Sequence, residues 1–433
     1  MITGSGDSAI QAREAGVHVV DYLKSRGYVY DMSDEAALRK AFDEGAVTAY
    51  IGFDPTARSL HIGNQLGIMM LAVLQRFGNQ PIALGGGGTA LVGDPSGRTS
   101  VRDVLSEDQI RQNLRSILPQ FDRFLDFKGN RFGENPSAFL MNNADWLLEL
   151  KYIEFLRDIG RHFSVNEMLA AETYKNRIES GAGLNFVEFN YRIVQAFDFL
   201  HLFRTTGCRL QMGGSDQWGN IVAGVDLVRR EEGVQAFALV SPLITAASGE
   251  KLGKSAGNSI WLDSAMTTPW DYYQYWVNVD DADVERLLKL FTFVADDEIA
   301  RLTAVDGDAL REAKRVLARE VTSLAHGPTA AEEADASAQA LFGGESIAAM
   351  LADPNIPSMT IAAADVSRGI TNAEVFVAAT LVSSRGEARR LAAQGGLSID
   401  GVRVEEPDAA FAPGASARLL RVGKKRFRKI IVE

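Results

Sequence analysis

The chain has 433 residues, of which 46% are hydrophobic and 23% are charged, and a formal net charge of −11. Because this length exceeds that of one ordinary domain, two to four domains are expected. The single cysteine excludes an internal disulfide, and five widely spaced histidines argue against a structural metal site. No apolar run approaches the roughly 20 residues that span a bilayer, and the N-terminus lacks the apolar core of a secretory signal, so we expect a cytoplasmic protein.

Residues 46–94 alternate short β-rich runs with a helical pattern. The β-rich runs are AVTAYIGF, QPIALGGGG and TALVGDPSG, and NQLGIMMLAVLQRF lies between the first two with apolar residues at helical spacing. A strand, a helix and a strand in this order predict a βαβ unit, and hence an α/β fold with a parallel sheet of Rossmann type. Helical patterns from Glu107 to Phe203 precede the strand-rich CRLQMGGSDQWGN and AFALVSPLIT. The sheet is therefore expected to be split by a helical insertion.

The rest of the chain predicts two further domains. Residues 263–349 are helical and acidic, and ADPNIPSMT suggests a linker over 350–365. In the last unit, 366–433, a helix stopped by Gly395 and Gly396 precedes a hairpin signal, IDGV, which predicts a small α+β domain. Twelve Lys or Arg against seven Asp or Glu give this unit a charge of +5 and leave −16 for the remainder. We expect an acidic body with a basic appendage suited to a polyanion.

The motif FDPTARSLHIGN suggests a phosphate site near the first strand. A lone histidine beside leucine and isoleucine is more often a core or turn residue. Here a strand that ends at Phe53, a turn at Pro55 and a helix that starts near His61 place the imidazole and the following amides at a helix N-terminus, where phosphate binds well. Gly63 would let a ligand approach the backbone closely.

Two later segments carry glycines and positive charge. The run Gly85–Gly88 is either a flexible loop or a tight passage at the carboxyl edge of the sheet, where ligands of such folds bind. The loop after it holds Arg98 and Arg102, which are either a solvated face or a clamp for a leaving polyphosphate.

The segment KLGKSAGNS has two lysines around a glycine. A P-loop needs an earlier glycine where this chain has Ser248, so a P-loop is excluded. The alternatives are ordinary surface charge and a cationic loop that stabilises a transferring phosphoryl group transiently.

Together, HIGN and KLGKS resemble the paired HIGH and KMSKS signatures of class I aminoacyl-tRNA synthetases. Within that class, the order and spacing of YIGFDPTARSLHIGN, VGDPSG, NYRIVQAFDF, CRLQMGGSDQWGN and KLGKS resemble those of the bacterial-type tyrosyl-tRNA synthetases. The resemblance runs from about Tyr50 to Asp280 and continues into the C-terminal unit. The chain departs from the HIGH pattern at Asn64, whose side-chain amide offers an N–H donor near the place of a histidine nitrogen.

The resemblance implies a two-step reaction. Tyrosine and ATP would form tyrosyl-adenylate and release pyrophosphate, and the tyrosyl group would then pass to the terminal ribose of tRNA(Tyr). It implies ATP as a substrate with Mg²⁺ and no tightly bound cofactor. In-line attack by a carboxylate needs no general base, so catalysis would rest on positioning and charge stabilisation. A tryptophanyl-type ligase, another nucleotidyltransferase and an RNA-binding scaffold with a vestigial activation site are the alternatives.

The resemblance also implies roles for individual residues. Tyr50 and Asp198 would contact the phenol of tyrosine. The full tyrosine-binding set would be Tyr50, Asp94, Tyr191, Gln195, Asp198, Gln211 and Gln217. The ATP-binding set would be Gly52, Asp54, His61, Gly63, Asn64, Gly213, Asp216 and Lys254. The catalytic set would be Thr56, His61, Asn64, Arg98, Arg102, Lys251, Lys254 and Ser255. Because Tyr191, Gln195 and Asp198 fall at i, i+4 and i+7, one helix face would present all three.

The resemblance finally implies partners for each domain. Residues 1–262 would form the catalytic domain, and its insertion at about 120–185 would form a symmetric homodimer. Residues 263–349 correspond to the anticodon-side domain of the family. The last unit, through SSRGEARRLAAQGGLSIDG, resembles a small RNA-binding module, and its positive charge would attract the phosphates of tRNA(Tyr).

Overall fold

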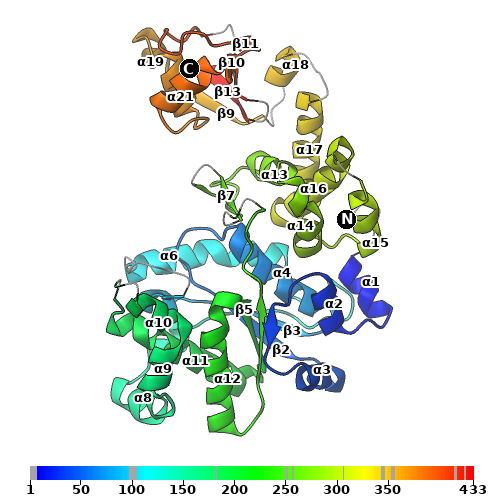
Figure 1. The fold of residues 1–433 in the computed structure, drawn as a ribbon, viewed down its shortest axis with the longest axis vertical. Coiled ribbons are helices and arrows are strands. Elements are labelled where there is room, and N and C mark those ends of the chain that lie inside the picture. The colour runs from blue at the N-terminus through cyan, green and yellow to red at the C-terminus, as the bar shows by residue number, and fades with distance from the viewer. Residues whose placement is uncertain are drawn as a thin grey trace.

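The computed structural model describes residues 7–433 except 97–104, 180, 182, 248, 250–251, 256–257, 306, 343–346, 353–355, 414–416 and 424–425. Of residues 172–173, 254–255, 258, 308, 340–342 and 349 it describes the backbone alone. Figure 1 shows a sheet with flanking helices at one end, a group of helices in the middle and a small unit at the other end. Within the described part, no helix is both long and apolar enough to cross a membrane.

The central sheet confirms the predicted Rossmann type. Its six described strands have the order β1-β6-β5-β2-β3-β4, and all neighbours pair in parallel except β1 with β6. The strands are β1 (Asp31–Met32), β2 (Thr48–Phe53), β3 (Gln80–Gly85), β4 (Phe139–Asn142), β5 (Leu210–Gly214) and β6 (Phe237–Ser241). The predicted βαβ unit is β2, α4 (Ile62–Arg76) and β3.

Alternation along β2 assigns its side chains to two different faces of the sheet. Ile51 and Phe53 join the large hydrophobic cluster that includes α4, whereas Tyr50 joins a second cluster on the side of α11 (Phe186–Thr206). Both faces are covered, so the strand is a nearly continuous apolar run. Tyr50 therefore faces the helix that carries Asp198.

Two short elements differ from the sequence prediction. The run TALV, expected among the β-rich segments, forms the helix α5 (Thr89–Val92), in which the Ala90 N–H donates to the Gly86 carbonyl. The strand β4 lies inside the stretch expected to be helical. Short apolar runs of this length do not distinguish a strand from a helix by periodicity, and tertiary pairing decides between them.

The insertion and its flanks are mainly helical, as predicted. The helices between β3 and β6 after α5 are α6 (Glu107–Ile117), η1 (Leu118–Arg123), α7 (Ala144–Leu147), α8 (Tyr152–Asp158), η2 (Gly160–His162), α9 (Val165–Ala170), α10 (Glu172–Glu179), α11, η3 (Ser215–Gln217) and α12 (Trp218–Glu232). The longest, α11, begins with Asn185 in a capping box and ends at Gly207, which has φ +70°.

The middle of the molecule is built from the helices that follow the six-stranded sheet in the chain (Figure 1). They are α13 (Pro269–Val277), η4 (Asp281–Asp283), α14 (Val284–Phe291), α15 (Asp296–Thr303), η5 (Gly307–Leu310), α16 (Arg311–His326) and α17 (Pro328–Phe342). Near the start of the chain, α1 (Ser8–Glu14) and α2 (Val19–Ser25) precede β1, and α3 (Glu35–Glu44) lies between β1 and β2 in sequence. One hydrophobic cluster contains residues of α4, α13, α14 and α16. The predicted helical region 263–349 therefore packs directly on the helix that begins with HIGN.

The C-terminal unit has its own hydrophobic core and a sheet of order β11-β10-β12-β13-β9 among its described residues. Its elements are α18 (Ile347–Ala352), β9 (Ser358–Ile361), α19 (Ala363–Ser367), α20 (Asn372–Ala378), α21 (Arg385–Ala393), β10 (Leu397–Ile399), β11 (Val402–Arg403), β12 (Ala417–Val422) and β13 (Arg426–Val432). The predicted IDGV hairpin forms, with Asp400 at φ 48° and Gly401 at φ 78°.

The boundary predicted at Val366 falls inside this unit. The strand β9 lies in the segment 350–365 that was expected to be a linker, and it pairs in parallel with β13. Only four residues long and preceded by Pro357, β9 gives a weak strand signal in the sequence. Its position at the edge of the sheet depends on pairing with the last strand of the chain.

Candidate active site

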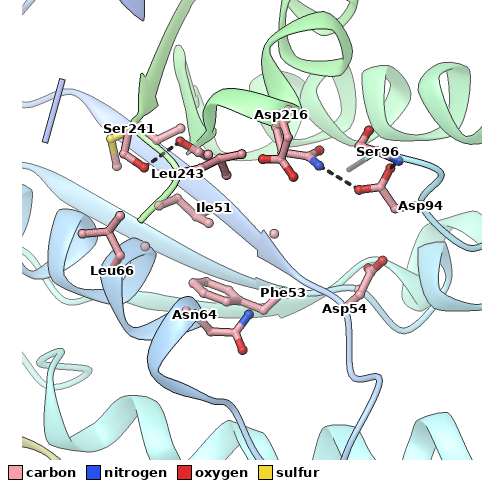
Figure 2. A pocket seen from close by; sticks show the side chains of 18 of the residues that line it. Ile51, Phe53, Asp54, Asn64, Leu66, Asp94, Ser96, Asp216, Ser241 and Leu243 are labelled. Atoms are coloured by element: carbon pink, nitrogen blue, oxygen red, sulfur yellow. Dashed lines mark hydrogen bonds between the residues drawn. The ribbon is translucent and has the colours of Figure 1, made fainter. Parts of the chain in front are cut away.

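A cavity of about 760 Å³ opens at the carboxyl ends of β2, β3, β5 and β6. Ligands of open α/β sheets bind at this edge. Figure 2 shows Asp54, Asp94 and Asp216 around the cavity, with Asn64 at the start of α4. Fourteen residues predicted from the sequence line it: Tyr50, Gly52, Asp54, His61, Gly63, Asn64, Asp94, Tyr191, Gln195, Asp198, Gln211, Gly213, Asp216 and Gln217.

At the inner end of the cavity, Asp198 accepts two hydrogen bonds. The side-chain amide of Asn143 donates to Oδ2 and the indole N–H of Trp146 donates to Oδ1, each at 2.8 Å. Asp198 is only 2% exposed. Burial raises its pKa to about 7, although both hydrogen bonds oppose this shift. The two donors fix the orientation of the carboxylate.

The hydroxyl of Tyr50 faces the same end. It is buried and has no hydrogen-bond partner among the described residues, and burial raises its pKa well above 10. Its ring meets Phe199 edge to face, with centroids 5.4 Å apart. Because an unpartnered buried hydroxyl is costly, this group is suited to a ligand that brings a polar atom.

A network of side chains connects this end of the cavity to Asp54. Asn143 donates to Thr89 Oγ1 at 3.0 Å, Thr89 donates to Asp54 Oδ1 at 2.7 Å, and the Tyr191 hydroxyl donates to Asp54 Oδ2 at 3.1 Å. Sequence reasoning missed Asn143, Trp146 and Thr89. Asn143 follows β4 and Thr89 begins α5, and these are the two elements that the sequence pattern did not reveal.

Asp94 forms the opposite wall. Its Oδ2 accepts from Gln217 Nε2 at 2.7 Å and its Oδ1 accepts from the Ser96 N–H at 2.8 Å, as Figure 2 shows. Gln195 Oε1 and Gln211 Oε1 are buried without a partner among the described residues. Four of the described lining residues are Asp and none is Lys or Arg. The described wall is therefore electronegative and suits a ligand with an ammonium group.

The glycine run after β3 is a tight passage and not a flexible loop. A Cβ on Gly86 would lie 2.0 Å from Asp54 Oδ1, and one on Gly87 would lie 2.4 Å from Asn142 Oδ1. A Cβ on Gly88 would come within 2.8 Å of Leu147. Side chains at these positions would therefore displace the Asp54 carboxylate, which lines the cavity, and the side chains of Asn142 and Leu147 behind it.

The HIGN segment closes on itself at the N-terminus of α4. The His61 N–H donates to Asn64 Oδ1 at 3.1 Å, and the Asn64 N–H donates to His61 Nδ1 at 3.3 Å. This capping box confirms that His61 lies at a helix N-terminus. It uses the amide oxygen of Asn64 and leaves the amide nitrogen for a ligand. A Cβ on Gly63 would lie 2.9 Å from His61 Cε1, so a side chain at this position would displace the imidazole from the cap.

The predicted phosphate-side residues are only partly described. Leu252 and Gly253 line the cavity, and Lys254 and Ser255 form β7 (Lys254–Ser255), which pairs with β8 (Asn258–Ser259). Arg98, Arg102 and Lys251 lie outside the described residues. Thr56 is exposed in the turn after β2 and does not line the cavity.

A family model described as "tRNA synthetases class I (W and Y)" matches residues 43–343. The chain belongs to this class I synthetase family. A Clostridium tetani tyrosine--tRNA ligase is 46% identical over 422 residues, covering 96% of this chain and 100% of the relative. One from Desulfosudis oleivorans is 48% identical over 437 residues, covering 96% and 99%.

Solved structures agree with this assignment. A C-terminally truncated mitochondrial tyrosyl-tRNA synthetase of Aspergillus nidulans aligns with a TM-score of 0.68 at 33% identity, covering 77% of this chain and 97% of that one. A tryptophanyl-tRNA synthetase of Encephalitozoon cuniculi, 14% identical with a TM-score of 0.53, shares the fold alone. This class I synthetase attaches L-tyrosine to tRNA(Tyr) in an ATP-dependent reaction.

Proposed function

We propose that the cavity holds tyrosine and ATP during adenylate formation, with the tyrosine phenol between Tyr50 and Asp198. The observation that carries this proposal is the pair of buried polar groups at the inner end, an unpartnered hydroxyl and a carboxylate held by two N–H donors. A phenol satisfies both groups. Phenylalanine fits the same space but leaves the Tyr50 hydroxyl buried without a partner and offers Asp198 no O–H donor, and a site built to hydrogen-bond a substrate hydroxyl rejects an analogue that lacks it.

The tyrosine ammonium would lie near Asp94, Tyr191 and Gln195. The support is the excess of Asp and the absence of Lys and Arg among the described residues that line the cavity. Gln211 and Gln217 would complete the pocket, with amide groups for the carboxylate of the substrate. Gln217 already donates to Asp94 at 2.7 Å, so this side chain would connect the group proposed for the ammonium with the group proposed for the carboxylate.

ATP would occupy the outer part of the cavity. Its ribose would lie near Gly213 and Asp216, and its phosphates would lie near the helix N-terminus formed by His61, Gly63 and Asn64. The N–H groups of a helix start favour bound phosphate. Gly52 and Asp54 would border the nucleotide. Thr56 would have to reach the γ-phosphate from the exposed turn.

Positive charge for the phosphates would come from two loops and from Mg²⁺. The loops carry Arg98, Arg102, Lys251, Lys254 and Ser255. Since the described lining offers carboxylates and no Lys or Arg, a triphosphate fits it best when cations accompany it. Mg²⁺ binds oxygen ligands and is commonly coordinated by the phosphates of a substrate. We therefore propose that it arrives bound to ATP and neutralises part of the phosphate charge.

We also propose a homodimer formed through residues 120–185 and RNA contacts by 263–349 and 366–433. Large hydrophobic side chains are exposed in the insertion, which supports a protein interface: Leu148, Tyr152, Ile153, Leu156, Val165, Leu169 and Ile178. The net charge of +5 supports RNA binding by the last unit.

The test is the exchange of pyrophosphate with ATP, measured in the presence of each of the twenty amino acids in turn. Tyrosine is expected to support exchange and phenylalanine is expected to fail. Efficient exchange with phenylalanine would contradict the placement of the phenol between Tyr50 and Asp198, while the charging activity itself would stand.

A further inference from the structure

The backbone of the KLGKS segment is joined to the helical region by one hydrogen bond from its glycine. The N–H of Gly253 donates to the hydroxyl oxygen of Tyr275 at 2.8 Å, and Tyr275 lies on α13. On its other side, the Gly253 carbonyl accepts from the Ile260 N–H at 2.7 Å, and the Ile260 carbonyl accepts from the Ile62 N–H at 3.1 Å. Gly253 is therefore held between α13 and the first residue of the HIGN helix.

The backbone at this position favours glycine. Its φ is +84°, and a Cβ at this position would lie 3.1 Å from the Cβ of Ile62. The residue is buried, so its N–H needs an acceptor inside the protein. Tyr275 supplies that acceptor. Burial raises the pKa of the Tyr275 hydroxyl, which therefore stays protonated at neutral pH.

The segment before KLGKS is attached to the same region. The Ala247 N–H donates to Asp283 Oδ2 at 2.8 Å, and the guanidinium of Arg286 donates to the Thr245 carbonyl at 2.6 Å. These two contacts hold the residues that precede the KLGKS segment, whereas the contact with Tyr275 holds a residue of the segment itself. Lys254 follows Gly253 directly, so the position of the Gly253 backbone determines the position of the Lys254 backbone.

We propose that Tyr275 is a positioning residue for adenylate formation, which holds the KLGKS backbone through Gly253 so that its lysines meet the phosphates of ATP. The inference rests on the proposed role of this loop at the ATP phosphates. Removal of the hydroxyl leaves a buried N–H without an acceptor and lets the loop adopt other arrangements. The loss then appears in ATP use and not in tyrosine binding, because Tyr50 and Asp198 lie on other elements.

The experiment compares Tyr275→Phe with Tyr30→Phe in the full-length protein. Tyr30 is 68% exposed and lies away from the cavity lining, so its variant controls for loss of a tyrosine hydroxyl. We expect Tyr275→Phe to lower kcat/KM for ATP in pyrophosphate exchange by about tenfold, the effect of one lost buried hydrogen bond. The dissociation constant for tyrosine should not change, and trypsin should cleave after Lys251 or Lys254 faster than in the control.

Two outcomes would overturn the inference: unchanged ATP kinetics in Tyr275→Phe, or an equal loss in ATP use and tyrosine binding with a lower melting temperature. A second variant, Lys254→Ala, tests the proposed role of the KLGKS loop independently of Tyr275. If Lys254→Ala impairs ATP use and Tyr275→Phe does not, the positioning role fails alone. If Lys254→Ala has normal ATP kinetics, the proposed role of the loop fails as well.

Discussion

Trp146 donates its indole N–H to Oδ1 of Asp198 at 2.8 Å, and this contact joins α7, which follows the strand β4 that the sequence pattern did not reveal, to the helix α11 that the pattern predicts. With Asn143 on the other oxygen, both carboxylate oxygens face N–H donors. Two hydrogen bonds fix the orientation of this carboxylate, and they therefore also fix the directions in which its remaining lone pairs can accept from a ligand. The geometry of the phenol site is thus set by residues that do not themselves contact tyrosine in our proposal.

The first prediction concerns the charge of Asp198. Asp198→Asn keeps the shape of the side chain but places an amide N–H against an N–H donor, either Asn143 or Trp146. We expect kcat/KM for tyrosine in pyrophosphate exchange to fall by about a hundredfold, because a buried polar group loses its partner and the phenol loses its acceptor. The matched control is Asp226→Asn, a half-exposed carboxylate on α12 that pairs with Arg229. Near-normal kinetics in Asp198→Asn would remove this carboxylate from the phenol site.

The second prediction follows from the raised pKa of the same carboxyl, which burial shifts from 3.8 to about 7. Since the ionised form accepts from the phenol, kcat/KM for tyrosine should rise with pH through about 7. Stability should change in the opposite direction. The folded state holds a proton that the unfolded state has released, so the free energy of unfolding should fall as pH rises toward 7, relative to Asp198→Asn. Denaturant titrations at several pH values measure the free energy of unfolding. The same pH dependence in wild type and Asp198→Asn would contradict the raised pKa of Asp198.

The same region shows how far sequence reasoning reached. The strand, helix and glycine signals around HIGN predicted the parallel sheet and the helix N-terminus at His61. The family resemblance singled out Tyr191, Gln195 and Asp198, and their i, i+4 and i+7 spacing predicted a shared helix face. These features are local, so short-range patterns encode them.

What the sequence did not reveal depends on contacts between distant segments. The four residues of β4 become a strand by pairing with β3, and Asn143 and Trp146 enter the site only through that pairing. Likewise, β9 becomes a strand because it pairs with β13 near the other end of the unit. The contact of Tyr275 with Gly253 also joins two segments whose patterns are independent.

A third prediction separates the two functions of Asn64. Asn64→Asp keeps an oxygen that accepts from the His61 N–H and places negative charge at a helix N-terminus, so stability should be retained. It removes the amide N–H and brings a carboxylate toward the phosphates, so KM for ATP should rise about tenfold. Asn64→Ala should raise KM for ATP and also lower the free energy of unfolding by about 1 kcal/mol through loss of the cap. Equal ATP kinetics in wild type and Asn64→Asp would show that the amide nitrogen does not serve ATP.

A fourth prediction concerns the C-terminal unit. A chain that ends at Phe342, the last residue of α17, removes β9 together with the sheet that it joins and avoids an orphaned strand. Adenylate formation should be retained, because the cavity is built from residues before that point. Charging of tRNA should weaken by about tenfold or more and should depend less on salt, since phosphate contacts by the basic unit are lost. The unit touches α13 through Arg428 and Asp271, 3.9 Å apart. Equal loss of both steps would assign the unit a folding role.

A fifth prediction tests the homodimer through Ile153, the most exposed of the large hydrophobic side chains in the insertion at 73%. Ile153→Asp should place a charge in the proposed interface and shift the protein toward monomer by at least about tenfold in dissociation constant, because burial of an unpaired carboxylate is costly. Sedimentation equilibrium measures this shift. Val402→Asp is the matched control, since Val402 is 70% exposed in the hairpin of the C-terminal unit and lies outside the insertion. A dimer of unchanged affinity in Ile153→Asp would exclude this face, and equal weakening by Val402→Asp would transfer the interface to the C-terminal unit.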